Sequence, residues 1–415
     1  MTIRVHTMAT LALAAAVVGA GTLMGGAPAL AKDKETMTRA VGLPLQAAQK
    51  DFQKGDYQAG LSQIDKANGE AKKSPYEQHT INQMYVFGYQ RMKQWTKVAP
   101  KLEALVGDGF TTPQQVQQYT VALAQINYQI HNYPDAIKYG EQAIAKGWGN
   151  AQMTTLVGQA YYLGGNWRGT VDFEKRMIAA DEQKGVAPAN EPLQLLLSSC
   201  LKLKDEACET DALEKLIVYH PKTQYWQQML YTMFNSVKSD PNLLQTYRLA
   251  SDVGVLKQPH EITDFAELAI EAGSPGEAEQ VMQQALQNNI YTDAQAKAKA
   301  ERILRDAQTQ AKRDQASLPR LAREAAASSN GNQDYGLGLA YYGYRQYDKA
   351  VAALKEGIAK GGLKSPAEAQ LLLGISQLKA GDKAAALKTF KKVKGNPVLE
   401  HLATLWSLRA RQTTA

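Results

Sequence analysis

Apolar residues recur at three- and four-residue spacing through most of the chain, as they do on one face of an amphipathic helix. Strand-like alternation is scarce, while alanine and glutamine are abundant. The clearest unit has two helical stretches on either side of Arg345-Gln346. Its repeated positions, at offsets of 3, 9, 12, 16 and 19 residues from the first, are Gly338, Tyr341, Tyr347, Ala350, Leu354 and Gly357.

The same offsets recur elsewhere in the chain. One copy reads Gly374, Gln377, Lys383, Ala386, Phe390 and Val393. A second reads Ala124, Asn127, Tyr133, Ala136, Gly140 and Ala143, and a third reads Ala48, Asp51, Tyr57, Gly60, Ile64 and Ala67. Small residues let two antiparallel helices approach closely, while large ones fill the space between hairpins. Because each hairpin leaves an apolar face exposed, stacking in series predicts a solenoid.

This pattern resembles the tetratricopeptide repeat family, whose unit is a helix-turn-helix of about 34 residues. The match is strong over residues 117–180 and 331–396. It is looser around Gly158, where Glu174 replaces an apolar residue. The resemblance implies an all-α fold, an α-solenoid of stacked antiparallel hairpins, in an exported bacterial protein of this family.

The first position of each unit, which we call its anchor, sets the expected number of repeats. The anchors are Ala48, Val86, Ala124, Gly158, Ser198, Ala266, Gly338 and Gly374. Two gaps, of 68 and 72 residues, are each about two units long, so we expect degenerate hairpins near 223–252 and 293–327. This gives roughly ten units, followed by a helix from about Val398 to Arg411 that caps the stack.

Turn residues and repeat quality divide the chain into four predicted stretches. Residues 1–31 form a leader, and residues 32–190 form N-terminal repeats. Residues 191–330 hold degenerate repeats with a long charged helix, and residues 331–415 hold the C-terminal repeats and the capping helix.

The N-terminus has the order of a secretory signal peptide. Arg4 precedes an uncharged run from Met8 to Met24, and the small residues Ala27 to Ala31 follow. We expect cleavage between Ala31 and Lys32 and a periplasmic or secreted protein; an uncleaved anchor helix is the alternative. No later stretch has the ~18 consecutive apolar residues of a membrane span, so we expect no stable membrane insertion.

Charge and cysteine content narrow the possible partners. The net charge is +7, or +6 without Arg4, which is too small a surplus for a nucleic-acid binding surface. In an oxidising compartment the two cysteines, Cys200 and Cys208, are expected to form a disulfide; two reduced thiols are the alternative. Two cysteines cannot make a four-ligand zinc site by themselves.

Catalytic and cofactor motifs are missing from the sequence. His260-Glu261 starts a zincin-like motif, but Asp264 stands where its second histidine would be. Gly336-Leu337-Gly338 lacks the third glycine of a dinucleotide-binding loop. We therefore expect no catalytic residue, metal or cofactor, although carboxylates that meet only in the fold could still make a cell-wall hydrolase.

The candidate binding residues lie on the first helix of each unit. Positions one, four and five after the anchor, and three before it, share the face that in the resembled family lines the concave groove. These residues are Gln83, Phe87, Gln90, Arg91, Gln125, Tyr128, Gln129, Gln159 and Tyr162. Glutamines and aromatics suit binding of an extended peptide or a glycan, whereas packing between repeats is the alternative reading.

The sequence therefore predicts a non-catalytic scaffold or adaptor of the bacterial envelope that binds a protein partner, with glycan binding as the alternative. Two segments of the chain are basic. Residues 293–327 carry eight cations against five acids, and four lysines follow Lys383 at 388, 391, 392 and 394. Both are typical of solvated helices. A docking patch for an acidic partner or an anionic envelope surface is the second interpretation.

Overall fold

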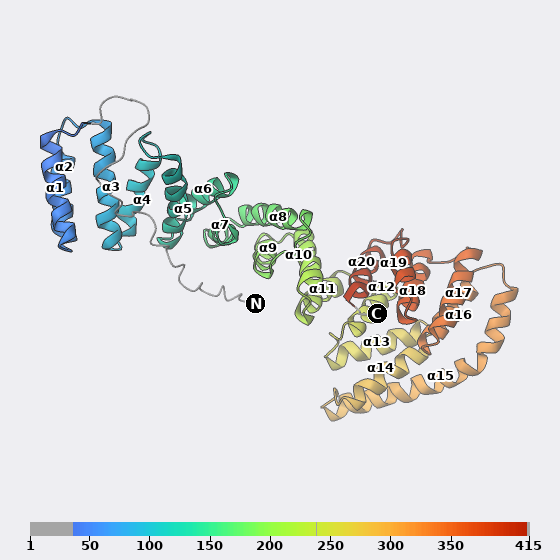
Figure 1. Ribbon diagram of the computed structural model, residues 1–415. Helices are drawn as coiled ribbons and strands as arrows, with labels where there is room; N and C mark the ends of the chain where they lie inside the picture. The colour runs from blue at the N-terminus through green and yellow to red at the C-terminus, as the bar shows by residue number, and fades with distance from the viewer. Residues whose placement is uncertain (1–35, 238, 413–415) are drawn as a thin grey trace. The chain divides into compact units, whose positions relative to one another are not determined.

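The computed structural model describes residues 36–237 and 239–412, and these residues contain helices and no strand (Figure 1). The all-α prediction is confirmed. None of the described helices is long and apolar enough to cross a membrane. The predicted signal peptide lies outside the described residues.

The chain divides into two compact units, the first ending at Cys208 and the second beginning at Glu209. Helices of the first unit are α1 Arg39–Gln53, α2 Tyr57–Gly69, α3 Pro75–Arg91, α4 Trp95–Val106, α5 Pro113–Gln129, α6 Tyr133–Ala145, α7 Ala151–Leu163, α8 Trp167–Gln183 and α9 Asn190–Leu203. Helix α10, Glu206–Tyr219, runs across the division.

Helices of the second unit follow in chain order. They are α11 Thr223–Ser236, α12 Asp240–Asp252, α13 Pro259–Glu271, α14 Pro275–Gln287, α15 Ala294–Ala327, α16 Asn332–Gly343, α17 Tyr347–Lys360, α18 Pro366–Lys379, α19 Lys383–Phe390 and α20 Pro397–Gln412. Apart from α15 and α20, they pair as antiparallel hairpins.

The anchors lie where the two helices of a hairpin meet. A Cβ atom on Gly338 would lie 2.6 Å from Leu354, and one on Gly374 would lie 2.5 Å from Phe390. Such distances are shorter than real contacts, so a Cβ atom at these two positions would push the covering side chain aside. The large residue sixteen positions later fills the space above the anchor, as the repeat predicts.

A left-handed residue lies in the turn of each of the five hairpins named next. Seven positions after an anchor, φ is 82° at Gly55 and 90° at Gly381. The same position has φ of 55° at Lys93, 61° at His131 and 57° at Arg345. Left-handed backbone costs a non-glycine residue roughly 1–2 kcal/mol, so packing of the two helices must impose the turn.

The two hairpins predicted for the long gaps between anchors differ in the structure. The hairpin near 223–252 is confirmed as α11 and α12. The prediction of a hairpin near 293–327 is wrong, because α15 is a single unbroken helix of 34 residues. No glycine interrupts this stretch, and alanine, glutamine, lysine and arginine, which dominate it, favour helix. The long charged helix expected within residues 191–330 is this element.

The C-terminal helix α20 does more than cap the last hairpin. It packs against α18 and α19, and also against α12, which lies about 150 residues earlier. Arg409 Nε donates to Asp252 Oδ2 at 2.7 Å, and Gln412 Nε2 donates to the Ile217 carbonyl at 2.6 Å. Lys379 also pairs with Asp252. Helix α20 therefore joins the α18/α19 hairpin to α12 and to the end of α10.

Cys200, near the end of α9, and Cys208, near the start of α10, are joined by a disulfide with Cα atoms 5.5 Å apart. The turn between them has Lys204 in the left-handed region. Asp205 Oδ1 accepts a hydrogen bond from the Cys208 amide at 3.1 Å, which caps the start of α10. The disulfide thus holds the turn between α9 and α10 closed.

Candidate functional site

Helices α3, α5 and α7 carry the nine residues proposed from sequence as a binding face. Arg91 and Gln129 are exposed, whereas Gln159 is buried, with 1% of its surface exposed. The remaining residues are half-buried, namely Gln83, Phe87, Gln90, Gln125, Tyr128 and Tyr162. The face therefore mixes available side chains with side chains that connect one repeat to the next.

A polar chain links three successive first helices. The Tyr128 hydroxyl of α5 donates to Gln159 Oε1 of α7 at 2.7 Å. Gln159 Nε2 in turn donates to Glu191 Oε1 of α9 at 2.5 Å. Burial raises the pKa of Tyr128, and the charges of Tyr133 and Glu191 add to the effect. Because both ends of its amide are bonded inside the protein, Gln159 connects repeats and has no free group for a partner.

The aromatic members of the face pack against neighbouring helices. The Phe87 ring lies 5.2 Å from the Phe52 ring, and the Arg91 guanidinium lies 5.2 Å over the Phe87 ring. Tyr162 makes a 2.8 Å hydrogen bond with Ser198 of α9, and its ring lies edge-on to Trp167 at 5.0 Å. Phe87 and Tyr162 therefore pack between repeats, as the alternative reading of the sequence expected.

Five side chains of the face remain without a hydrogen bond among the described residues. We call them the glutamine face: Gln83, Gln90, Arg91, Gln125 and Gln129. A glutamine amide both donates and accepts hydrogen bonds, as a peptide backbone does. Four unpaired amides and one guanidinium on consecutive first helices can therefore bind a polar chain.

Glu174 of α8 packs against Gly158 of α7, at the position where the sequence departs from the repeat. Only 1% of its surface is exposed, and its Oε2 accepts no hydrogen bond within the described part of the chain. Burial raises its pKa to about 8, and the charge of Glu191 contributes. A Cβ on Gly158 would overlap this carboxyl. Because no substrate can reach it, Glu174 is unsuited to acid-base catalysis despite its raised pKa.

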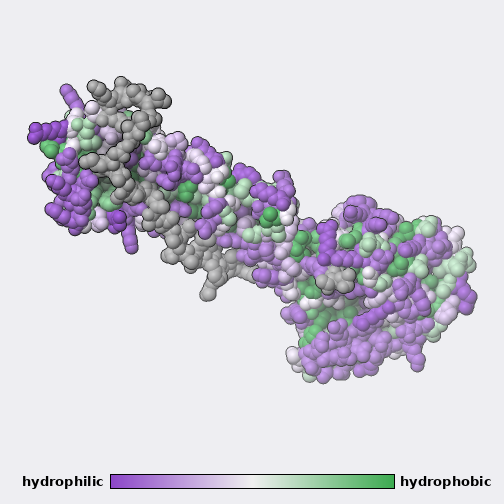
Figure 2. Space-filling model, viewed as in Figure 1, coloured by the Kyte–Doolittle hydropathy of each residue, from purple (hydrophilic) through white to green (hydrophobic). Residues whose placement is uncertain are grey.

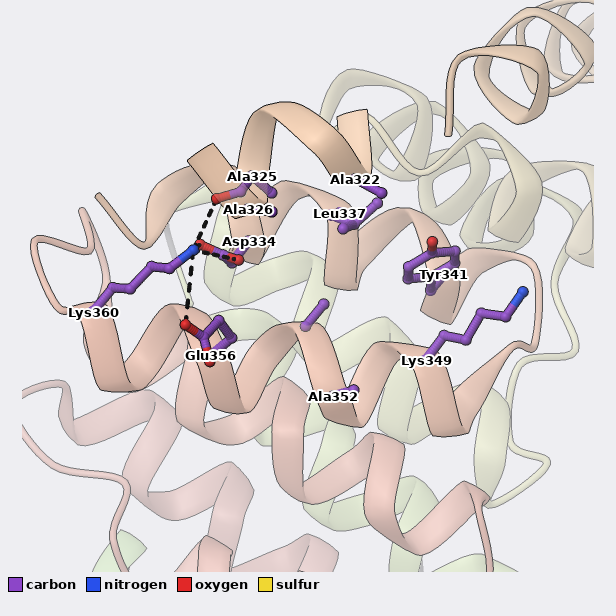
Figure 3. Close-up of a pocket in the computed structure, with 11 residues that line it drawn as sticks. Ala322, Ala325, Ala326, Asp334, Leu337, Tyr341, Lys349, Ala352, Glu356 and Lys360 are labelled. Carbon is purple, nitrogen blue, oxygen red and sulfur yellow. Dashed lines mark hydrogen bonds and ion pairs between the residues drawn. The ribbon is translucent and has the colours of Figure 1, made fainter. Parts of the chain in front are cut away.

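A groove of about 420 Å³ in the second unit was not found from sequence (Figure 3). Its floor is formed by Leu337 and Tyr341 of α16, and alanines of α15 and α17 form its walls. Lys349 lies at one end, 5.6 Å from the Tyr341 ring. At the other end Lys360 Nζ lies 3.0 Å from Asp334 Oδ2. The alanines come from two helices, so no local pattern marks the groove.

Within residues 36–237 and 239–412, no group of three or more histidine, cysteine, aspartate or glutamate residues could hold a metal ion. The Asp334 carboxylate is paired with Lys360, and the Glu103 carboxylate accepts from Lys138 at 3.1 Å. These carboxylates are occupied by ion pairs.

Residues 335–397 match the sequence model of the tetratricopeptide repeat. A tetratricopeptide repeat protein from Parabacteroides merdae aligns over 79% of this chain and 98% of its own, at 11% identity and a TM-score of 0.27. Yeast Tom70 aligns over 89% of this chain and 95% of its own, at 11% identity and a TM-score of 0.21. No curated protein sequence matches the chain.

Proposed function

Because residues 335–397 belong to the tetratricopeptide repeat family, whose fold is typical of protein-protein interaction scaffolds, we propose that this protein is a non-catalytic scaffold that binds a partner polypeptide. The proposed contact surface is the glutamine face of α3 and α5. The observation that carries the proposal is the set of amides left without partners, since unpaired polar groups on a rigid scaffold suit recognition of an extended backbone.

The polar chain formed by Tyr128, Gln159 and Glu191 supports this role. Tyr128, Gln159 and Glu191 link α5 to α7 and α9, so the free amides of Gln125 and Gln129 lie on a helix that is held in place before a partner arrives. Preorganisation of this kind lowers the entropic cost of binding. Gln159 and Tyr162 then act as supports of the surface and not as contacts.

We further propose that the protein works outside the cytoplasm, in the periplasm or after secretion, as an adaptor in an envelope process. Two features support this compartment. Residues 1–31 have the composition of a secretory leader, and a disulfide at Cys200 and Cys208 is stable in oxidising surroundings. Mass spectrometry of the mature N-terminus and of a non-reduced digest tests both points; an N-terminus upstream of Lys32 or free thiols would contradict them.

The binding role is tested by affinity capture from an envelope extract. The variant Gln90→Ala/Gln125→Ala/Gln129→Ala removes three free amides and leaves the polar chain beneath intact. Its matched control removes three exposed glutamines from second helices, Gln58→Ala/Gln183→Ala/Gln283→Ala. We expect a polypeptide that binds the wild type and the control and is lost with the first variant. Partners retained equally by both variants would count against the glutamine face.

Glycan binding is the second candidate, because half-buried Tyr128 and Tyr162 rings lie beside uncharged amides, a combination that suits sugar rings. The same two variants decide it on a glycan array. Glycan binding lost only with the glutamine-face variant would replace the polypeptide proposal. A hydrolase would instead turn over purified peptidoglycan, and with Glu174 inaccessible we expect no turnover.

A further inference from the structure

Helix α15 carries a row of cations on the side that faces away from the second unit. We call it the basic stripe: Arg302, Arg305, Lys312, Arg313, Arg320 and Arg323. At 3.6 residues per turn these six positions fall within an arc of about 100°. The buried residues of α15 lie on the opposite side, namely Ala300, Ile303, Ala307, Ala311, Leu318 and Ala325. Figure 2 shows hydrophilic surface along this edge of the unit.

The stripe is largely unneutralised. Helix α15 has eight cations and four carboxylates, a surplus of four, whereas the whole chain has a net charge of +7. Within the described residues, Arg320 pairs with Glu324 at 2.6 Å, and the other five cations of the stripe have no ion pair. Like charges three residues apart, as at Arg302 and Arg305, destabilise a helix slightly. An anionic partner would remove this repulsion.

The other faces of α15 narrow the choice of partner. Its N-terminal half is buried in a core cluster with Phe265 and Met282, and its C-terminal half in one with Leu337 and Ala340. The apolar face is thus occupied and cannot enter a lipid bilayer, as an amphipathic membrane helix must. The helix also has no aromatic residue on which nucleic-acid bases could stack.

We propose that the basic stripe binds an acidic polypeptide segment. Five of its six cations are arginines, whose guanidinium groups bind carboxylates through two parallel hydrogen bonds. From Arg302 to Arg323 the stripe is about 32 Å long at 1.5 Å per residue. An extended segment of about ten residues has the same length. This surface is separate from the glutamine face, and the proposal does not depend on it.

Fluorescence anisotropy of the full chain with a labelled Glu-Ser repeat peptide of about twelve residues tests the proposal. The variant Arg302→Gln/Arg305→Gln/Arg313→Gln/Arg323→Gln removes four charges from the stripe. Its matched control, Lys355→Gln/Lys388→Gln/Lys391→Gln/Lys392→Gln, removes four charges from exposed lysines of the same unit that make no ion pair among the described residues. At about 0.15 M salt we expect the stripe variant to weaken binding at least about tenfold and the control to weaken it less than about twofold.

Two probes separate a peptide site from general attraction to anions. A Gln-Ser peptide should not bind, and circular dichroism should show the same helix content in both variants. Equal loss of peptide binding in the stripe variant and the control would overturn the proposal. It would also fail if the peptide did not bind while phosphatidylcholine vesicles enriched in phosphatidylserine bound through the stripe, because that result would assign the surface to a membrane.

Discussion

The hairpins α7/α8 and α18/α19 place different residues at the same point of the repeat. In α18/α19, Phe390 covers the anchor Gly374 and is 3% exposed. In α7/α8, the carboxyl of Glu174 covers Gly158 and is no more exposed than that ring. The two helices are paired in both cases. Spacing and a small anchor therefore suffice to form the hairpin, and the covering residue decides how its stability responds to solution conditions.

The difference is chemical. A phenyl ring contributes burial energy at every pH, whereas a carboxyl in the same place must remain protonated or be left as an unpaired buried charge. The N-terminal unit also uses polar contacts between repeats, through Tyr128 and Gln159 and through Tyr162 and Ser198. We therefore expect the two hairpins to respond differently to substitution and to pH.

Loss of the apolar cover should have the largest effect. Phe390→Ala removes a buried ring above Gly374 and leaves a cavity, which costs about 3–5 kcal/mol. Hydrogen exchange of the α18 and α19 amides in the full chain measures this, since protection falls with local stability. Thr404→Ala, an exposed change on α20, is the control. Unchanged protection of α18 in the Phe390 variant would show that the ring does not hold the hairpin.

Ionisation of Glu174 should make α7/α8 sensitive to pH. The pKa of Glu174 in the folded state, about 8, lies above the ordinary glutamate value of 4.5, so the folded state holds its proton over a range in which the unfolded chain releases it. The stability that this group contributes is complete below about pH 4.5 and is lost as the pH rises to about 8. Within that window the free energy of unfolding falls by about 1.4 kcal/mol per pH unit.

Glu174→Gln should abolish this slope in the hydrogen exchange of the α7 and α8 amides, after correction for the pH dependence of the intrinsic exchange rate. Glu191→Gln is the matched control. It removes the neighbouring charge, lowers the pKa of Glu174 and narrows the window while leaving the slope within it. The same slope in wild type and Glu174→Gln would mean that another group titrates.

The sequence predicted features that depend on local spacing. The anchors follow from offsets that one helix pair imposes on its own residues, whereas the α11/α12 hairpin was inferred from the length of the gap between two anchors. The single helix α15 was not predicted, because the gap of about two units between anchors was assumed to hold a hairpin. The absence of glycine from residues 294–327 was a usable signal against that hairpin. The contact of α20 with α12 joins segments about 150 residues apart, which no local pattern records.

The candidate site was less predictable for a related reason. Helical geometry placed Gln125 and Gln159 on corresponding faces, but burial depends on the residues of the next repeat. Glu191 of α9 accepts from Gln159 and draws it inside, whereas Gln125 has no such acceptor and stays half-buried. The periodicity of one helix predicts the face on which a side chain lies. It does not predict which residue of the next repeat that side chain contacts.

The smallest expected effect concerns the polar contacts between repeats. Tyr128→Phe removes the hydroxyl that donates to Gln159 and should lower the stability of α5 and α7 by about 1 kcal/mol, because a buried acceptor loses its donor. Tyr341→Phe is the matched control, since its hydroxyl makes no hydrogen bond in the described structure and its loss should change hydrogen exchange very little. If both substitutions had the same effect, the rings alone would hold the repeats together.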